Sequence, residues 1–184
     1  TTSFKEWAGK LKQYAQSAEL KGEARVWRSV QARDLRSLPV DFPSGDNTEA
    51  SSTSILVELT KEETQVLLRD VPATFQTEIN DVLLAALVDA LSAWTGSRKL
   101  LVDLEGHGRE EIVPDVDLSR TVGWFTTIFP VLLDASDAVG VAEMLAAVKR
   151  QLRAVPNKGI GYGLLRYLSG DGEQFKSLPQ AEVN

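Results

Sequence analysis

Residues Val102–Pro130 read VDLEGHGREEIVPDVDLSRTVGWFTTIFP. Two apolar, strand-like runs, at Lys99–Leu104 and Phe125–Leu133, form the two ends of this stretch. Between them lie the chain's single histidine, several glycines and several ionisable residues. Such a loop is poor material for a hydrophobic core, because buried charges are costly unless they are paired. The stretch therefore predicts a β layer that carries a functional loop.

Helical patterns surround these two runs. Apolar residues recur at helical spacing behind Ser3, the predicted N-cap of a first helix, and a second helical stretch carries Trp27. The sequence Thr60–Glu63 is typical of a capping box. The run Val82–Gly96, VLLAALVDALSAWTG, is apolar on most faces, so we expect a helix that is buried at the domain centre and ends at Gly96. Two further helices are predicted at residues 141–154 and 164–168.

The order of these elements predicts the fold class. Thr53–Thr60 (TSILVELT) alternates between apolar and polar residues, which predicts another strand. Strands that alternate with helices favour an α/β fold with helices packed on a mostly β layer. We expect one domain over residues 1–184, in which residues 1–50 form a helical arm and connector and residues 51–184 form the α/β core.

Composition excludes several classes of function. The chain has 184 residues, a formal net charge of -6 and no cysteine, and this acidic balance argues against a nucleic-acid partner. No apolar run approaches the roughly 18 residues that span a bilayer, so no membrane partner is expected. Without cysteine and with one histidine, the chain cannot build a thiolate or multi-histidine metal site. Together with a start, Thr1–Trp7, that lacks signal-peptide features, this predicts a cytoplasmic protein.

Glu105 is the first candidate for chemistry. It is expected at the end of the first strand-like run, where its side chain projects beyond the sheet edge. A carboxylate in a semi-dry cleft can act as a general base, because desolvation favours its uptake of a proton. The glycines beside His107 permit a positive φ, and Arg109 can orient a carboxylate or fasten the loop. The alternative is a turn held by an Arg–Glu pair, with His107 as a structural residue.

Other motifs carry weaker signals. Trp124 and Phe125 follow a glycine and either line a substrate tunnel or pack in the core, and residues 115–120 are typical of a capped turn. Residues 156–163 (PNKGIGYG) lack the lysine followed by serine or threonine of a P-loop, so nucleotide binding is not expected. No G-x-S-x-G elbow occurs, which argues against a serine hydrolase.

Four blocks of the sequence are informative when they are taken together and in order. They are Asn80–Leu87 (NDVLLAAL), Glu105–Glu110 (EGHGRE), Arg120–Thr126 (RTVGWFT) with Pro130, and Pro156–Gly163. Together they closely resemble the C-terminal half of an epimerization domain of a nonribosomal peptide synthetase. The opening TTSFKEWAGKLKQYA is similar to the segment that joins the two lobes of such a domain. EGHGRE and RTVGWFT differ from the pattern of ordinary condensation domains, and the resemblance covers nearly the whole chain.

Epimerization domains belong to the condensation-domain superfamily, whose two lobes each have a chloramphenicol-acetyltransferase-like fold. The resemblance implies an α/β lobe, a two-layer sandwich in which a mixed β-sheet packs with helices. It implies inversion, L to D, of the α-carbon of an aminoacyl or peptidyl thioester on the 4'-phosphopantetheine arm of a peptidyl carrier protein, with no cofactor bound directly. Glu105 would be the catalytic carboxylate of an acid/base pair. The residues implied to line the substrate site are His107, Arg109, Trp124 and Tyr162.

The resemblance also has a gap. The family's HHxxxDG motif belongs to the N-terminal lobe, and this chain contains no His-His pair. The resemblance therefore implies half of an active site, which has the N-terminal lobe of the same domain as its partner and no activity without it. Two alternatives stay open: a condensation-type lobe that forms a peptide bond, and a non-catalytic module that docks a carrier protein.

Overall fold

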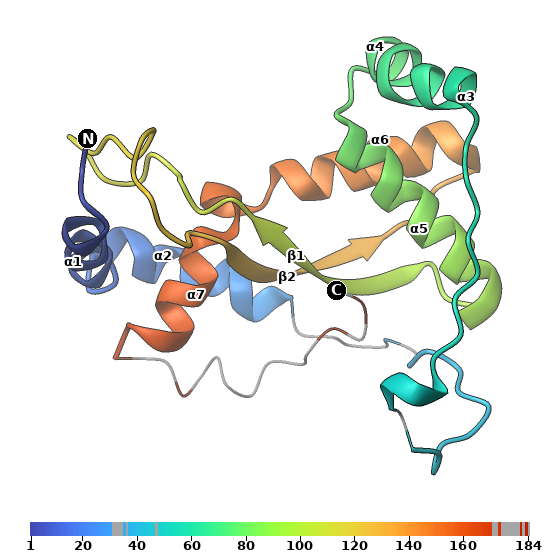
Figure 1. Ribbon diagram of the computed structural model, residues 1–184, viewed down its shortest axis with the longest axis horizontal. Helices are drawn as coiled ribbons and strands as arrows, with labels where there is room; N and C mark the ends of the chain where they lie inside the picture. The colour runs from blue at the N-terminus through green and yellow to red at the C-terminus, as the bar shows by residue number, and fades with distance from the viewer. Residues whose placement is uncertain are drawn as a thin grey trace. The chain divides into compact units, whose positions relative to one another are not determined.

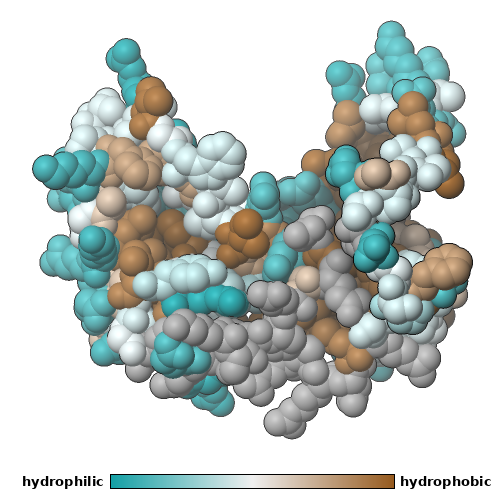
Figure 2. Space-filling view, turned by 60° about the horizontal axis from the view of Figure 1, so that its bottom comes forward, coloured by the Kyte–Doolittle hydropathy of each residue, from teal (hydrophilic) through white to brown (hydrophobic). Residues whose placement is uncertain are grey.

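The structure is a computed structural model that describes residues 1–30, 35, 37–46, 48–170, 173, 181 and 183. It divides into two compact units, each discontinuous in sequence (Figure 1). The first comprises Thr1–Leu35, Leu100–Leu133 and Arg150–Asn184, and the second comprises Arg36–Lys99 and Asp134–Lys149. No helix in the described ranges is long and apolar enough to cross a membrane. Exposed apolar side chains lie on both units, and Figure 2 shows hydrophobic areas, in brown, on one face of the molecule.

A two-stranded sheet forms the base of the first unit. Strands β1 (Lys99–Gly106) and β2 (Thr127–Asp134) pair with each other, and their arrows point in opposite directions (Figure 1). The three successive residues 100–102 are all buried, as expected for a strand that is covered on both faces. Val102 also forms an isolated parallel bridge with Val183. Both strand-like runs and the α/β class are confirmed.

Helix α1 (Phe4–Tyr14) begins as its sequence predicts. Ser3 Oγ accepts a hydrogen bond from the backbone N–H of Glu6 at 3.2 Å, which satisfies one of the unpaired donors of the first turn. Trp7 is 2 % exposed and lies in a buried cluster with Leu118, Phe125 and Ile160. The helix is thereby fixed to the loop that follows β1.

Helices α2 (Ala18–Ser29) and α7 (Ile160–Tyr167) pack against each other in the first unit. The rings of Trp27 on α2 and Tyr162 on α7 contact each other, with centroids 5.3 Å apart. A 3-10 turn, Pro156–Gly159, leads directly into α7, so the predicted helix at residues 164–168 begins four residues earlier than expected.

The second unit is mostly helical. Its helical elements are a 3-10 turn (Glu49–Ser51), α3 (Lys61–Gln65), a π-helical segment (Val66–Asp70), α4 (Val71–Phe75), α5 (Ile79–Thr95) and the start of α6 (Gly140–Arg153). The capping box is confirmed, because Thr60 and Glu63 exchange reciprocal side-chain-to-backbone hydrogen bonds. The glycine stop is confirmed as well, since Gly96 has φ 68 in the left-handed region.

Two expectations for the second unit are wrong. Thr53–Thr60 is extended but belongs to no strand in the described structure, and Ile55, Leu56 and Val57 are 90 %, 83 % and 85 % exposed. α5 is not buried at a centre, because only one face packs and Trp94 remains 56 % exposed. Both segments are apolar enough for burial, but the described residues supply no partner strand for the first and cover only part of the second.

Glu23, on α2, is a buried acid in the first unit and is 8 % exposed. Its carboxylate accepts hydrogen bonds from Asn157 Nδ2 at 2.6 Å and from Trp27 Nε1 at 3.4 Å. A Cβ at Gly161 would lie 2.0 Å from Glu23 Oε2, so the carboxylate occupies space that only glycine leaves open. Burial raises the pKa of Glu23, and its two hydrogen bonds counteract only part of this rise.

We expect this acid to make the stability of the chain depend on pH. Below the ordinary pKa of 4.5, Glu23 is protonated in both the folded and the unfolded chain, and its contribution to the free energy of unfolding is fully present. As the pH rises towards the folded-state pKa, Glu23 ionises first in the unfolded chain. Each pKa unit of difference between the two states then lowers the free energy of unfolding by about 1.4 kcal/mol. Denaturant unfolding of the wild type and of Glu23→Gln should be compared from about pH 4 to about pH 8. The free energy of unfolding of the wild type should fall relative to that of the variant as the pH rises. Parallel curves would contradict this expectation.

Candidate functional site

Glu105 lies at the end of β1, as expected from the sequence. It is the penultimate residue of the strand, and its side chain is exposed. Because side chains alternate along a strand, Asp103 points to the same face of β1. The carboxylate of Glu105 is therefore presented at a strand end, open to a group that approaches this face.

The loop after Glu105 is held in one conformation by its glycines. A Cβ on Gly106 would lie 2.9 Å from Thr127 Oγ1 of the paired strand. Gly108 has φ +67, and a Cβ there would lie 1.6 Å from the carbonyl oxygen of Phe125. At Gly108 the backbone of Phe125 leaves no room for a side chain, whereas a side chain at Gly106 would require Thr127 to shift.

Arg109 fastens this loop to the segment before β2. Its Nη2 donates to the carbonyl oxygen of Thr121 at 2.9 Å, its Nη1 donates to the carbonyl oxygen of Leu118, and its guanidinium stacks 3.9 Å from the ring centroid of Phe125. The sequence left open whether Arg109 pairs with a glutamate or a ligand. In the structure these contacts are to backbone carbonyls and an aromatic ring, so Arg109 shapes the loop.

His107 is exposed and pairs within the same loop. Its Nδ1 accepts a hydrogen bond from the backbone N–H of Arg109 at 3.0 Å, and its Nε2 lies 3.2 Å from Glu110 Oε1. This geometry fits an imidazole with its proton on Nε2, donating to Glu110. The other carboxylate oxygen of Glu110 lies 3.4 Å from Lys158 Nζ.

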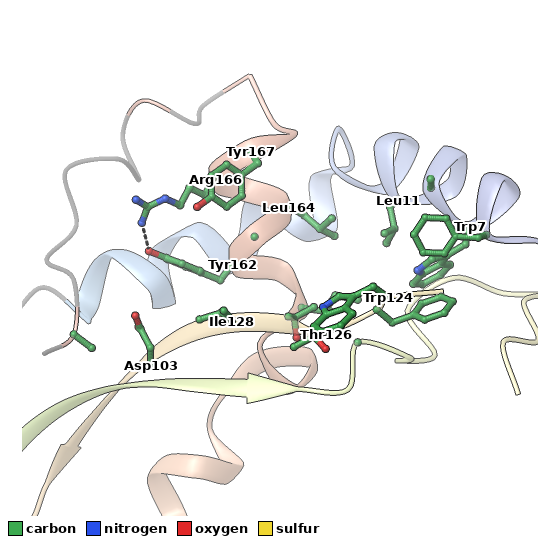
Figure 3. Close-up of a pocket in the computed structure, with 18 residues that line it drawn as sticks. Trp7, Leu11, Asp103, Trp124, Thr126, Ile128, Tyr162, Leu164, Arg166 and Tyr167 are labelled. Atoms are coloured by element: carbon green, nitrogen blue, oxygen red, sulfur yellow. Dashed lines mark hydrogen bonds between the residues drawn. The ribbon is translucent and has the colours of Figure 1, made fainter. Parts of the chain in front are cut away.

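A cavity of about 670 Å³ opens beside this loop in the first unit. It is lined by α1, β1, the segment before β2, β2 itself and α7 (Figure 3). Trp124 and Phe125 both line the cavity, and they differ in burial: Trp124 is 84 % exposed, whereas Phe125, 8 % exposed, also packs in the core. Tyr162 is buried and also lines the cavity.

One end of the cavity is polar. Figure 3 shows Asp103, Tyr162 and Arg166 towards this end, and Arg166 Nη1 donates a hydrogen bond to the Tyr162 hydroxyl at 2.8 Å. Partial burial raises the pKa of Asp103, and the charge of Arg166 opposes this rise. Sequence reasoning missed Asp103 and Arg166. The available signals were the two-residue spacing from Asp103 to Glu105 and the four-residue helical spacing from Tyr162 to Arg166.

The structure brings the predicted site residues into one neighbourhood but gives them different surroundings. The loop holds Glu105, His107 and Arg109, while the cavity wall holds Trp124 and Tyr162. No cluster of three or more histidine, aspartate or glutamate side chains with metal-binding geometry occurs among the described residues. Glu105 itself is not among the residues that line the cavity, whereas Asp103, two residues earlier on the same strand, and Gly108, three residues later in the loop, are.

The family model described as "Condensation domain" matches residues 1–184, the whole chain. The chain belongs to the condensation-domain family. Its relatives include one of the linear gramicidin synthase proteins of Brevibacillus parabrevis, 51% identical over 185 residues, and surfactin synthase subunit 2 of Bacillus subtilis (strain 168), 45% identical over 184 residues. Each match covers 100% of this chain but 2% and 5%, respectively, of the relative. The chain thus spans a small part of the proteins it matches.

One solved structure of the condensation-domain family resembles the chain closely. It is the epimerization domain from the third module of tyrocidine synthetase B, with a TM-score of 0.83 and 39% sequence identity. The match covers 92% of this chain and 38% of that chain. The resemblance to a condensation-superfamily domain of peptide synthetases is therefore confirmed, together with its α/β fold.

Proposed function

We propose that this chain is the C-terminal lobe of an epimerization domain, which inverts the α-carbon of a carrier-bound aminoacyl or peptidyl thioester from L to D. The observation that carries the proposal is the exposed carboxylate of Glu105 at the end of β1, on a loop fixed by glycines and Arg109. Similarity to a solved epimerization domain supports it. The assignment of residues 1–184 to one lobe is part of this proposal.

The chemistry requires two groups on opposite faces of the α-carbon. A thioester carbonyl acidifies the adjacent C–H, so a carboxylate at Glu105 can accept the proton and leave an enolate. A second group then returns a proton on the other face, and the C–H bond that breaks is replaced by one of inverted configuration. We assign the second group to the N-terminal lobe with its HHxxxDG motif, so the chain alone is expected to be inactive.

The cavity provides the place for the substrate side chain. We assign Trp124 and Tyr162 to its lining, while His107 and Arg109 shape the loop that carries Glu105. Aromatic walls favour an apolar side chain over a charged one. The substrate arrives on the 4'-phosphopantetheine arm of a peptidyl carrier protein, no cofactor is bound directly, and we place the protein in the cytoplasm.

A condensation-type lobe is the second candidate, because the matching family is described by condensation and not by epimerization. In that case the same face would serve peptide-bond formation, and Glu105 would be a structural residue. A non-catalytic module that docks a carrier protein is the third candidate. Exchange of the substrate's α-proton distinguishes epimerization from condensation and from docking alone.

Deuterium wash-in tests the proposal. The chain, joined to an N-terminal lobe with the HHxxxDG motif, is given a carrier loaded with an L-aminoacyl thioester in D2O. We expect deuterium at the α-carbon together with D product, and neither from the chain without the added lobe. Peptide-bond formation with a downstream acceptor but no exchange would move the chain to the condensation class. Neither reaction from the joined lobes would favour the docking module.

A further inference from the structure

The turn before α7 is held in an unusual backbone conformation. Asn157 (φ 44, ψ 38) and Lys158 (φ 49, ψ 33) are both left-handed, and Gly159 follows with φ 88. Residues other than glycine adopt this region at a cost in free energy, so two in succession persist only where their surroundings hold them. Such strain often marks a segment with a function.

Contacts on two sides hold this turn. Asn157 Nδ2 donates to the buried carboxylate of Glu23 at 2.6 Å, which fixes the turn to α2. Gly159 packs on the ring of Phe129 in β2 so closely that a Cβ would lie 2.1 Å from its Cδ1. The turn is therefore tied to a helix and to the sheet.

The third residue of the turn, Lys158, reaches the loop that follows Glu105. Its Nζ lies 3.4 Å from Glu110 Oε2, and its carbonyl oxygen lies 3.5 Å from where a Cβ of Gly106 would stand. The Lys158 side chain is 75 % exposed, but that of Glu110 is only 11 % exposed. The ion pair therefore gives a largely buried carboxylate a cationic partner, and His107 holds its other oxygen.

We propose that Lys158 is a positioning residue for Glu105. It links the turn to Glu110 in the loop after the catalytic carboxylate, while its carbonyl oxygen lies beside Gly106 at the end of β1, and so it fixes the direction in which Glu105 leaves β1. An ion pair with an exposed partner contributes little to global stability, so its role lies in the geometry of the loop. This inference rests on the proposed function of Glu105.

Charge reversal tests the link in the two-lobe domain with a loaded carrier. We expect Lys158→Glu and Glu110→Lys each to lower kcat for α-proton exchange about 10-fold or more, since small misplacement of a catalytic group is costly. KM for the carrier and the melting temperature should change little. The double variant Lys158→Glu with Glu110→Lys should restore most of kcat. Lys158→Arg, which keeps the positive charge, should retain most of it. Lys21→Glu, the same charge change at an exposed site on α2, should have no effect.

A second readout does not depend on turnover. The carboxyl signal of Glu105, identified in ¹³C-glutamate-labelled protein by its loss in Glu105→Gln, should shift or broaden in Lys158→Glu and return in the double variant. An unchanged signal with unchanged kcat, or a double variant no better than either single one, would overturn the positioning role. If the wild type shows no exchange at all, the proposed function fails, and the signal still decides whether Lys158 positions Glu105.

Discussion

Replacing Glu105 with glutamine should slow α-proton exchange in the two-lobe domain by about 10²–10⁴-fold. Glutamine preserves the size of the side chain but cannot take up a proton, so the barrier to forming the enolate rises. Because Glu105 is exposed at the end of β1, the substitution should leave the fold unchanged. Single-turnover deuterium exchange measures the loss directly, without a contribution from product release.

The matched control is Glu111→Gln. Glu111 is also an exposed glutamate, and it lies six residues further along the same loop region. The substitution Glu111→Gln makes the same change in charge away from the end of β1, so α-proton exchange should continue at the wild-type rate. Exchange that survives Glu105→Gln, or is lost equally in both variants, would remove Glu105 from the acid/base role.

Gly108→Ala should destabilise the domain by about 3 kcal/mol or more. Part of this cost arises because φ is +67, and the rest because the new Cβ would lie 1.6 Å from the carbonyl oxygen of Phe125. That oxygen is backbone, so it cannot rotate away, and the loop or the residues before β2 must move. We expect exchange to fall with it, since the loop carries Glu105. Denaturant unfolding and exchange kinetics on the same preparation test both effects.

Gly140→Ala separates the two sources of this cost. Gly140 begins α6 with φ +77, but no atom lies within 4 Å of the position that its Cβ would take. Only the cost of the left-handed backbone conformation applies here, so the free energy of unfolding should fall by about 1–2 kcal/mol. Equal losses at Gly108 and Gly140 would show that the loop relaxes around the new methyl group and that close packing against Phe125 is not required.

Signals that depend on neighbouring residues could be predicted from the sequence. The N-cap at Ser3, the capping box at Thr60 and the stop at Gly96 each require only a few adjacent residues, and the structure confirms all three. Strands β1 and β2 followed in the same way from the apolar runs, whose predicted ends lie within about two residues of the observed ones. In contrast, whether Thr53–Thr60 joins a sheet depends on a partner strand, which no local pattern reveals.

The same distinction between local signals and contacts of distant segments applies to the candidate site. The place of Glu105 followed from where its strand ends, because strand length and side-chain alternation are local properties. The cavity did not follow, because Asp103 and Arg166 line the same cavity only when α7 lies beside the sheet. The role of Lys158 was hidden as well: the sequence shows a glycine-rich turn, whereas the structure shows an ammonium beside Glu110.

The exposed segment around Ile55 has a practical consequence for handling the protein. Extended apolar residues with high β propensity and unpaired backbone groups can template pairing between chains. Glu58 is the one charge between Thr53 and Thr60, and it opposes such pairing through repulsion between identical copies. In concentrated solution this short segment, and not the acidic surface as a whole, should set the limit of solubility.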